Sequence, residues 1–320
     1  MKICVYEMYG AEQPYFEAWQ QRGIADIELH GEVPSLETAH LAKGCDGVTI
    51  LGAGHIDALL LDEWKRLGVK YLSTRTIGTN HIDLAHAKKI GIAVSSADYP
   101  PYSVAEFTIM LMLMCLRNYK PALWRAQVND FSLGGLEGRD LRNMTVGIVG
   151  TGRIGRAVIE DLQGFGCKLL AYNRHVRQDL ADKVQFVPLD ELFSQSDIVS
   201  LHVPLTEATH HLINDDTIAK MKRGVVLINC SRGGLADTSA LIRGIENGAI
   251  GALGMDVIEG EESIMHIDHG MDILRNQQMA YLRQFPNVVM TPHMAFFTDT
   301  DVASMVDCGI ESILEAAENQ

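Results

Sequence analysis

The sequence predicts an α/β protein made of two Rossmann-like, doubly wound parallel-sheet domains. Short apolar segments alternate with segments of helical spacing along almost the whole chain. Such alternation implies a parallel sheet that is covered by helices on both faces. The chain also has 320 residues, which is more than one hydrophobic core usually serves. Two domains are therefore expected.

The first hundred residues contain the first alternating series. We expect strand cores at 2–6, 47–51, 71–73 and 93–94, and helices at 15–22, 36–42, 57–67 and 84–90. A longer helix is expected from 103 to 128, with Ser103 as its N-cap and Glu106 at its third position.

A second series begins at Thr145. We expect strands at 145–149, 168–173, 198–202, 225–229, 252–255 and 288–291, and helices at 153–166 and 301–318. Pro100 and Pro292 interrupt the pattern, so the domain boundaries are expected near them. The predicted domains are residues 1–100 with 296–320, and residues 101–295.

The composition is that of a soluble globular protein, with 47% hydrophobic and 21% charged residues. The net charge of −14 argues against nucleic acid or an anionic membrane as the main partner. The first residues lack a signal-peptide pattern, and the longest apolar run, 107–116, is about half a membrane span. Six scattered cysteines form no CxxC pair, which favours reduced thiols and a cytoplasmic protein.

A glycine-rich segment lies between the strand at 145–149 and the helix that follows it, and it reads Gly150-Thr151-Gly152-Arg153-Ile154-Gly155. In this context the first glycine permits a tight turn, the second admits a pyrophosphate, and the third lets the helix pack on the strand. The helix N-terminus adds free N–H groups and partial positive charge. The segment predicts a dinucleotide site; the alternative is a merely tight strand-to-helix turn.

The end of the next strand is where an acidic residue would bind the ribose 2′-hydroxyl of NAD. This chain has Asn173 there, followed by Arg174, His175 and Arg177. A neutral residue beside cations favours NADP, or the use of both cofactors. The alternative is a set of solvated loop charges, with NAD held through Asn173.

Three residues that suit the reduction of a 2-oxo acid follow later strands. Arg232 comes after the strand at 225–229, Glu261 follows the strand at 252–255, and His293 follows the strand at 288–291. A guanidinium binds a carboxylate, an imidazole serves as proton donor, and a carboxylate keeps that imidazole charged. Singly they could be a surface charge, an acidic turn and a capping histidine. Their joint occurrence after strands of one sheet favours an active site.

Several motifs in order carry a family resemblance: VGIVGTGRIGRAV, DIVSLHVPLT, VVLINCSRGG, GMDVIEGEE and NVVMTPHMAFFT. Over nearly its whole length the chain resembles the D-isomer-specific 2-hydroxyacid dehydrogenases, and most closely their D-lactate dehydrogenase branch, including the vancomycin-resistance type. The resemblance implies a flavodoxin-like domain from the first and last segments, a Rossmann domain between them, and a cleft between the two domains. It also implies a homodimer packed through the long helix.

The resemblance assigns catalytic roles to Arg232, Glu261 and His293. Glu261 is chosen over Glu259 and Glu262 because the family's glutamate falls five residues after the motif aspartate, here Asp256. The cofactor-lining positions are implied to be Gly150, Gly152, Arg153, Ile154, Gly155, Asn173, Arg174, His202, Val203, Pro204, Cys230, Ser231 and Asp256.

Four further positions are implied to bind the substrate. The main-chain N–H groups of Ile77 and Gly78 would hold its carboxylate, and Tyr99 and Phe296 would surround a small side chain. His81 departs from the asparagine that the family usually carries.

The resemblance implies reduction of pyruvate, or a similar short 2-oxo acid, to the D-2-hydroxy acid with NADH or NADPH and without a metal. Two alternatives stay open. One is a dinucleotide-sensing scaffold, because corepressors share this fold and the three catalytic residues. The other is a reductase of glyoxylate, hydroxypyruvate, phosphoglycerate or branched 2-oxo acids.

Overall fold

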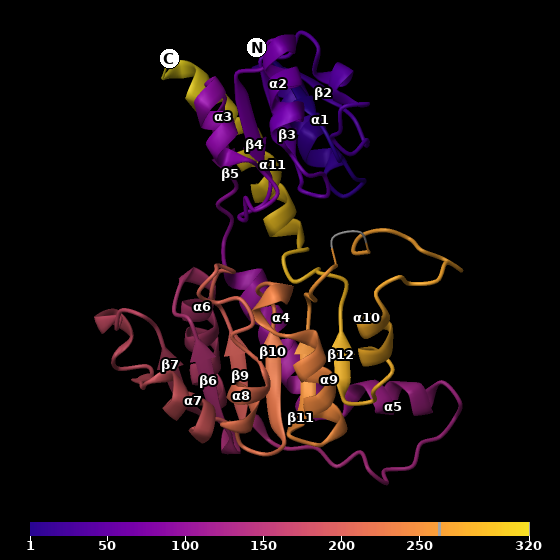
Figure 1. Cartoon of the computed structure of the whole chain (residues 1–320), viewed down its shortest axis with the longest axis vertical. Coiled ribbons are helices and arrows are strands. Elements are labelled where there is room, and N and C mark those ends of the chain that lie inside the picture. The colour runs from indigo at the N-terminus through magenta and orange to yellow at the C-terminus, as the bar shows by residue number, and fades with distance from the viewer. Residues whose placement is uncertain (262–263, 320) are drawn as a thin grey trace. The chain divides into compact units, whose positions relative to one another are not determined.

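The computed structural model describes residues 1–261 and 264–319 of the chain. It divides into two compact units, Met1–Pro100 with Phe297–Gln320 and Pro101–Phe296 (Figure 1). In the described part of each unit, a sheet with only parallel pairings carries helices on both faces. The predicted fold class is therefore confirmed.

The described part of the first unit contains a five-stranded sheet in the order β2-β1-β3-β4-β5. Its strands are β1 (Lys2–Val5), β2 (Asp26–Leu29), β3 (Gly47–Ile50), β4 (Tyr71–Thr74) and β5 (Ala93–Ser96). This is the flavodoxin-like order, whose ligand crevice lies beyond the carboxyl ends of β1 and β3. β2 was not predicted, because the acidic residues Asp26 and Glu28 on this edge strand obscure the apolar signal.

The sheet of the first unit has one core on each face because side chains alternate along every strand. The helices of this unit are α1 (Gln13–Arg22), α2 (Ala58–Leu67), α3 (Leu84–Ile90) and α11 (Asp299–Glu318). Ile3 and Val5 pack with α1 and α11, whereas Cys4 and Tyr6 pack with α2 and α3. In Figure 1 the last helix, in yellow, lies beside β4 and β5, so the end of the chain completes this unit.

Two helix predictions were wrong in part. The segment 36–42 forms only a short 3₁₀ helix, Ala39–Ala42, because Ser35 and Thr38 bond to nearby backbone groups and compete with a helical turn. The segment 103–128 forms two helices, α4 (Tyr102–Leu116) and α5 (Tyr119–Ala126), separated at Asn118, which adopts a left-handed conformation with φ 48°. Ser103 is not the N-cap, since α4 begins at Tyr102 directly after Pro101.

The described part of the second unit contains a seven-stranded sheet in the order β12-β11-β10-β9-β6-β7-β8. Its strands are β6 (Thr145–Val149), β7 (Lys168–Tyr172), β8 (Gln185–Phe186), β9 (Ile198–Leu201), β10 (Val225–Asn229), β11 (Ile250–Met255) and β12 (Val288–Met290). The strand order reverses between β6 and β9, as in the Rossmann fold. Ligands of such sheets bind beyond the carboxyl ends of the strands at this reversal.

The strands of this sheet are buried on both sides. One face is covered by α4 and α6 (Arg153–Leu162), and the other by α7 (Leu189–Gln195), α8 (Asp215–Ala219), α9 (Thr238–Glu246) and α10 (Gln277–Leu282). On β10, Val226 and Ile228 pack against the first face's helices, whereas Val225 and Leu227 pack against those of the second. No helix among the described residues is long and apolar enough to cross a membrane.

Candidate active site

The glycine segment after β6 forms a turn that other side chains would not permit. Gly150 has φ +98°, and a Cβ there would lie 2.5 Å from the carbonyl oxygen of His202. A Cβ on Gly155 would overlap the carbonyl oxygen of Gly150. The two glycines therefore bring the start of α6 against β6 and against the segment that follows β9.

The middle of the same turn is open. A Cβ on Gly152 would meet no atom within 4 Å, and α6 begins at the next residue, Arg153. The hydroxyl of Thr151 is buried and has no hydrogen-bond partner in the part of the chain that the structure describes. A dinucleotide pyrophosphate fits this turn, because the turn combines open space, an unpartnered hydroxyl and the N-terminus of α6. Ile154 lies in the first turn of that helix.

In the segment after β7, one arginine is paired with a carboxylate and another is exposed. Arg177 pairs with Asp179 at 3.2 Å, and Arg156 pairs with the same carboxylate. Arg174 is exposed. The side-chain amide of Asn173 donates to the carbonyl of His175 at 2.9 Å, which leaves the amide oxygen of Asn173 as an acceptor. Of the two arginines in the segment after β7 that the sequence singled out, Arg177 pairs with Asp179 and Arg174 does not.

The segments after β9 and β10 are joined to each other. The Ser231 hydroxyl donates to the carbonyl of Val203 at 2.7 Å, and the His202 imidazole contacts the Ser200 hydroxyl at 2.8 Å. Burial lowers the pKa of His202 to about 4, so this imidazole is neutral at neutral pH. The structure thus brings three predicted cofactor residues together beside the glycine turn.

Two further predicted cofactor residues lie in the same region. The carbonyl of Pro204 accepts a hydrogen bond from the Thr209 hydroxyl at 2.7 Å, which shapes the exposed turn. Cys230 is buried, and burial raises the pKa of its thiol to about 12. The protonated thiol is therefore the form expected at neutral pH.

Arg232 is held by a turn at the end of β10. Asn229 accepts from the Ser231 N–H at 3.0 Å and donates to the Arg232 carbonyl at 2.9 Å. Any Cβ on the next residue, Gly233, would overlap the backbone of Ile258. The backbone that carries Arg232 therefore lies directly against the segment that leads to Glu261.

The predicted histidine and glutamate form an ion pair. His293 Nδ1 lies 2.8 Å from Glu261 Oε1, with side chains that are 32% and 12% exposed. The other oxygen of Glu261 accepts from the Ile258 N–H at 2.7 Å. With Nδ1 engaged, Nε2 is the nitrogen of His293 that can act on a substrate. The alternative acid Glu262 lies outside the described residues, and Glu259 faces two other histidines.

Asp256 has a structural role that the sequence did not indicate. Its buried carboxylate accepts from the Thr291 hydroxyl at 2.6 Å, the Met294 N–H at 2.9 Å and the Ala295 N–H at 2.8 Å. These bonds bracket His293, whose φ of 53° is in the left-handed region. Asp256 therefore holds the turn that presents the imidazole.

His266 was also missed. Its Nε2 lies 2.9 Å from the main-chain carbonyl of His293, and the two rings are 6.0 Å apart. Phe296 makes an edge-on contact with the His293 ring at 6.5 Å. No sequence motif marks His266; its position a few residues after Glu261 is the only signal that could have found it.

The substrate segment predicted in the first unit follows β4. The N–H groups of Ile77 and Gly78 make no hydrogen bond to other described residues, and Ile77 is 42% exposed. The Thr76 hydroxyl donates to the Gly78 carbonyl at 2.7 Å, which keeps the turn in shape. Two main-chain donors are thus presented without an internal partner. Tyr99, from the same unit, is largely buried.

A buried ion pair, which no sequence motif indicates, anchors this segment. Arg75 Nε lies 2.6 Å from Glu12 Oε1, and both side chains are fully buried. A second guanidinium nitrogen donates to the Tyr6 carbonyl at 3.0 Å. The pair therefore ties the turn after β4 to the end of β1. His81, further along the turn, contacts the Thr74 hydroxyl at 3.3 Å.

A dinucleotide-binding sheet with an arginine, a histidine and a glutamate after its later strands defines a class of nicotinamide-dependent oxidoreductases. A family model for the D-isomer specific 2-hydroxyacid dehydrogenase NAD binding domain matches residues 109–295. A D-specific alpha-keto acid dehydrogenase from Enterococcus faecium is 45% identical, covering 98% of this chain and 97% of that protein. An aromatic 2-oxoacid reductase from Clostridium sporogenes is 40% identical, covering 98% of this chain and 96% of that protein.

A comparison with solved structures supports the same family. The pyruvate reductase of Chlamydomonas reinhardtii superposes with a TM-score of 0.94 at 34% identity, over 100% of this chain and 97% of that one. The chain belongs to the D-isomer-specific 2-hydroxyacid dehydrogenase family, and the resemblance drawn from its motifs is confirmed. It is an oxidoreductase with an NAD-binding domain.

Proposed function

We propose that the protein reduces a short 2-oxo acid, with pyruvate as the first candidate, to the D-2-hydroxy acid. The observation that carries the proposal is the pair of His293 and Glu261 at 2.8 Å on the strand ends of the dinucleotide-binding sheet. A carboxylate at this distance can accept the Nδ1 proton and hold the ring in place, while Nε2 gives a proton to the substrate.

The mechanism assigns one task to each side chain. Arg232 binds the substrate carboxylate and polarises the 2-oxo group with its fork of N–H donors. His293 gives its Nε2 proton to the oxygen as the C=O bond becomes C–OH, and Glu261 balances the charge of the imidazolium. When bound, the reduced nicotinamide supplies the hydride that C2 receives. Catalysis needs no metal in this scheme.

The substrate roles of Ile77, Gly78, Tyr99 and Phe296 are part of the same proposal. The N–H groups of Ile77 and Gly78, which are free of other described partners, are donors for a carboxylate. Phe296 limits the space beside His293, which supports a small substrate side chain. The name of the Clostridium sporogenes relative gives a specific reason to test aromatic 2-oxo acids as the second candidate class.

For the cofactor we propose that the enzyme uses NADH and also accepts NADPH. Asn173 offers an amide oxygen to a ribose hydroxyl, and the exposed Arg174 offers a cation to a 2′-phosphate. The pairing of Arg177 with Asp179 limits the positive charge of this segment. Preference for NADPH over NADH is therefore expected to be small.

A panel of substrates tests the proposal. Pyruvate, 2-oxobutyrate, 2-oxoisocaproate, phenylpyruvate and hydroxypyruvate would each be assayed with NADH and NADPH by the loss of reduced-nicotinamide absorbance. We expect turnover with pyruvate to exceed that with the others. A maximum with phenylpyruvate, 2-oxoisocaproate or hydroxypyruvate would move the assignment to that substrate class. NADH binding without turnover of any 2-oxo acid would contradict the proposal and support a dinucleotide-sensing scaffold.

We also propose a homodimer that packs through α4. A hollow of about 510 Å³ lies along this helix, lined largely by apolar side chains that include Ile109, Met110, Leu113 and Phe165. Met110 at this hollow is 38% exposed, so packing of a second copy here would remove apolar surface from water. Light scattering of the purified chain should give the dimer mass; a monomer at micromolar concentration would contradict this.

A further inference from the structure

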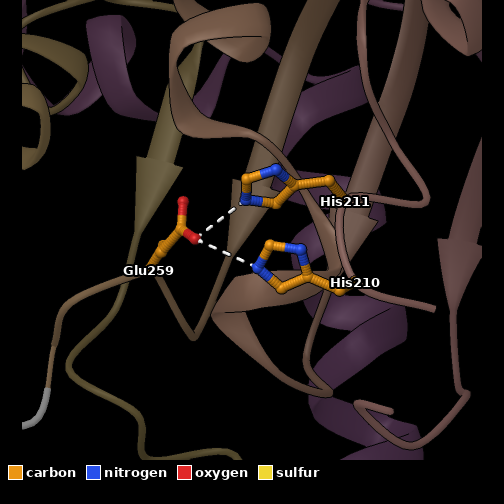
Figure 2. Close-up of side chains that lie close together, drawn as sticks. All are labelled: His210, His211 and Glu259. Atoms are coloured by element: carbon orange, nitrogen blue, oxygen red, sulfur yellow. Dashed lines mark hydrogen bonds and ion pairs between the residues drawn. The ribbon is translucent and has the colours of Figure 1, made fainter. Parts of the chain in front are cut away.

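Three metal-ligating side chains meet outside the residues assigned to catalysis. His210 and His211 lie in the segment after β9, and Glu259 lies after β11, yet their side chains converge (Figure 2). Glu259 Oε1 lies 2.8 Å from His211 Nε2 and 3.7 Å from His210 Nε2. The two imidazole rings are stacked 3.8 Å apart, so both nitrogens face the same carboxylate oxygen.

We propose that His210, His211 and Glu259 bind one divalent transition-metal ion, with Zn²⁺ as the best match. Two imidazoles and one carboxylate are typical ligands of Zn²⁺ and its neighbours, whereas Ca²⁺ and Mg²⁺ prefer oxygen ligands only. The three donor atoms lie within 4.8 Å of one another. A tetrahedral ion would keep its fourth position for water, since the His210 side chain is 53% exposed.

The backbone on both sides of the cluster is already fixed. The His211 N–H donates to the Gly234 carbonyl at 2.9 Å, and its carbonyl accepts from Asn214 at 3.0 Å. On the other side, the Glu259 carbonyl accepts from the Asn276 amide at 3.0 Å. A rotation of the exposed His210 and a shift of the Glu259 carboxylate would complete the site. The entropy lost on binding an ion is correspondingly small.

The proposed site is coupled to the residues assigned to catalysis. Glu259 stands two residues before Glu261 and directly after Ile258, whose N–H donates to Glu261. Because an ion would draw the Glu259 carboxylate towards His210, it would disturb this hydrogen bond and loosen the pair with His293. Bound Zn²⁺ should therefore lower kcat severalfold. This consequence, unlike binding itself, rests on the proposed function.

Binding is tested by titrating the untagged full chain with a zinc salt in a calorimeter. We expect one ion per chain, with a Kd raised at least tenfold in His210→Ala and unchanged in His40→Ala. His40 is an exposed histidine of the first unit and serves as the matched control. Equal affinity of wild type and His210→Ala would overturn the site. So would loss of binding in His266→Ala but not in His210→Ala, which would place the ion beside His293.

Kinetics form the second arm. Zn²⁺ should lower the kcat of the wild type and of His40→Ala but leave that of His210→Ala unaffected at the same concentration. Inhibition that persists in His210→Ala would overturn the coupling. The calorimetric arm needs no turnover, so binding remains measurable even if the 2-oxo acid reductase proposal fails.

Discussion

Replacing Glu261 by glutamine tests the charge pair of the proposed mechanism. The substitution keeps the shape of the side chain and removes the charge that faces His293 at 2.8 Å. Two unit charges about 4 Å apart interact by roughly 4 kcal/mol at an effective dielectric of about 20 and by roughly 1 kcal/mol in bulk water. Because the His293 side chain is 32% exposed, a value of about 2 kcal/mol is appropriate.

A free energy of about 2 kcal/mol corresponds to a factor of roughly thirty in a rate constant. The kcat for reduction of pyruvate should therefore fall by roughly thirtyfold in Glu261→Gln. The assay compares the kcat of Glu261→Gln with that of the wild type and with that of the exposed Glu207→Gln as control. A kcat of Glu261→Gln within about twofold of the wild type would refute the reasoning.

Three further predictions concern the cofactor side of the second unit. Gly152→Ala should fold normally, because its Cβ meets no atom, yet raise the Kd for NADH at least tenfold; Gly155→Ala should instead lower Tm, because its Cβ overlaps the backbone. Normal NADH binding by Gly152→Ala, measured by fluorescence, would contradict the cradle. Arg174→Ala should lower kcat/KM for NADPH about tenfold, the loss of roughly one charge-assisted bond, and leave that for NADH within about twofold; equal losses would contradict the assignment. Folding lowers the pKa of His202 from 6.5 to about 4, so protonation of this imidazole favours the unfolded chain. The contribution of neutral His202 to the free energy of unfolding is complete above pH 6.5 and is lost as the pH falls towards 4. Urea unfolding should show that the free energy of unfolding falls by about 2–3 kcal/mol over this range in the wild type, beyond any fall in His202→Asn. The same pH dependence in both proteins would contradict the burial of a neutral His202.

The fold could be predicted because buried parallel strands leave a strong local signal. The runs at 145–149 and 225–229 are mostly apolar and are observed as β6 and β10 with those bounds. Where the signal failed, a local interaction had outweighed it. Asn118 interrupts the long helix by adopting a left-handed conformation and donating to the Glu137 carbonyl. Neither this backbone conformation nor this hydrogen bond can be inferred from the periodicity of apolar residues.

The candidate site could be predicted where a reactive side chain comes shortly after the end of a strand. Arg232, Glu261 and His293 each come shortly after a strand of one sheet, so topology brings them to one edge. The long-range contacts that hold the site in place left no such signal. Asp256 bonds to residues 35–39 positions away, and Arg75 pairs with Glu12, 63 positions away. Their roles depend on tertiary packing, which a single sequence does not encode locally.

The central claim is that His293 donates the proton in D-specific reduction of a 2-oxo acid. It is tested most directly by chiral analysis of the product from pyruvate and NADH with the wild type and with His293→Ala. We predict that the wild type forms only D-lactate. We predict that His293→Ala loses at least a hundredfold in kcat while its Kd for NADH stays within about twofold. L-lactate from the wild type, or kcat within tenfold in His293→Ala, would contradict the claim.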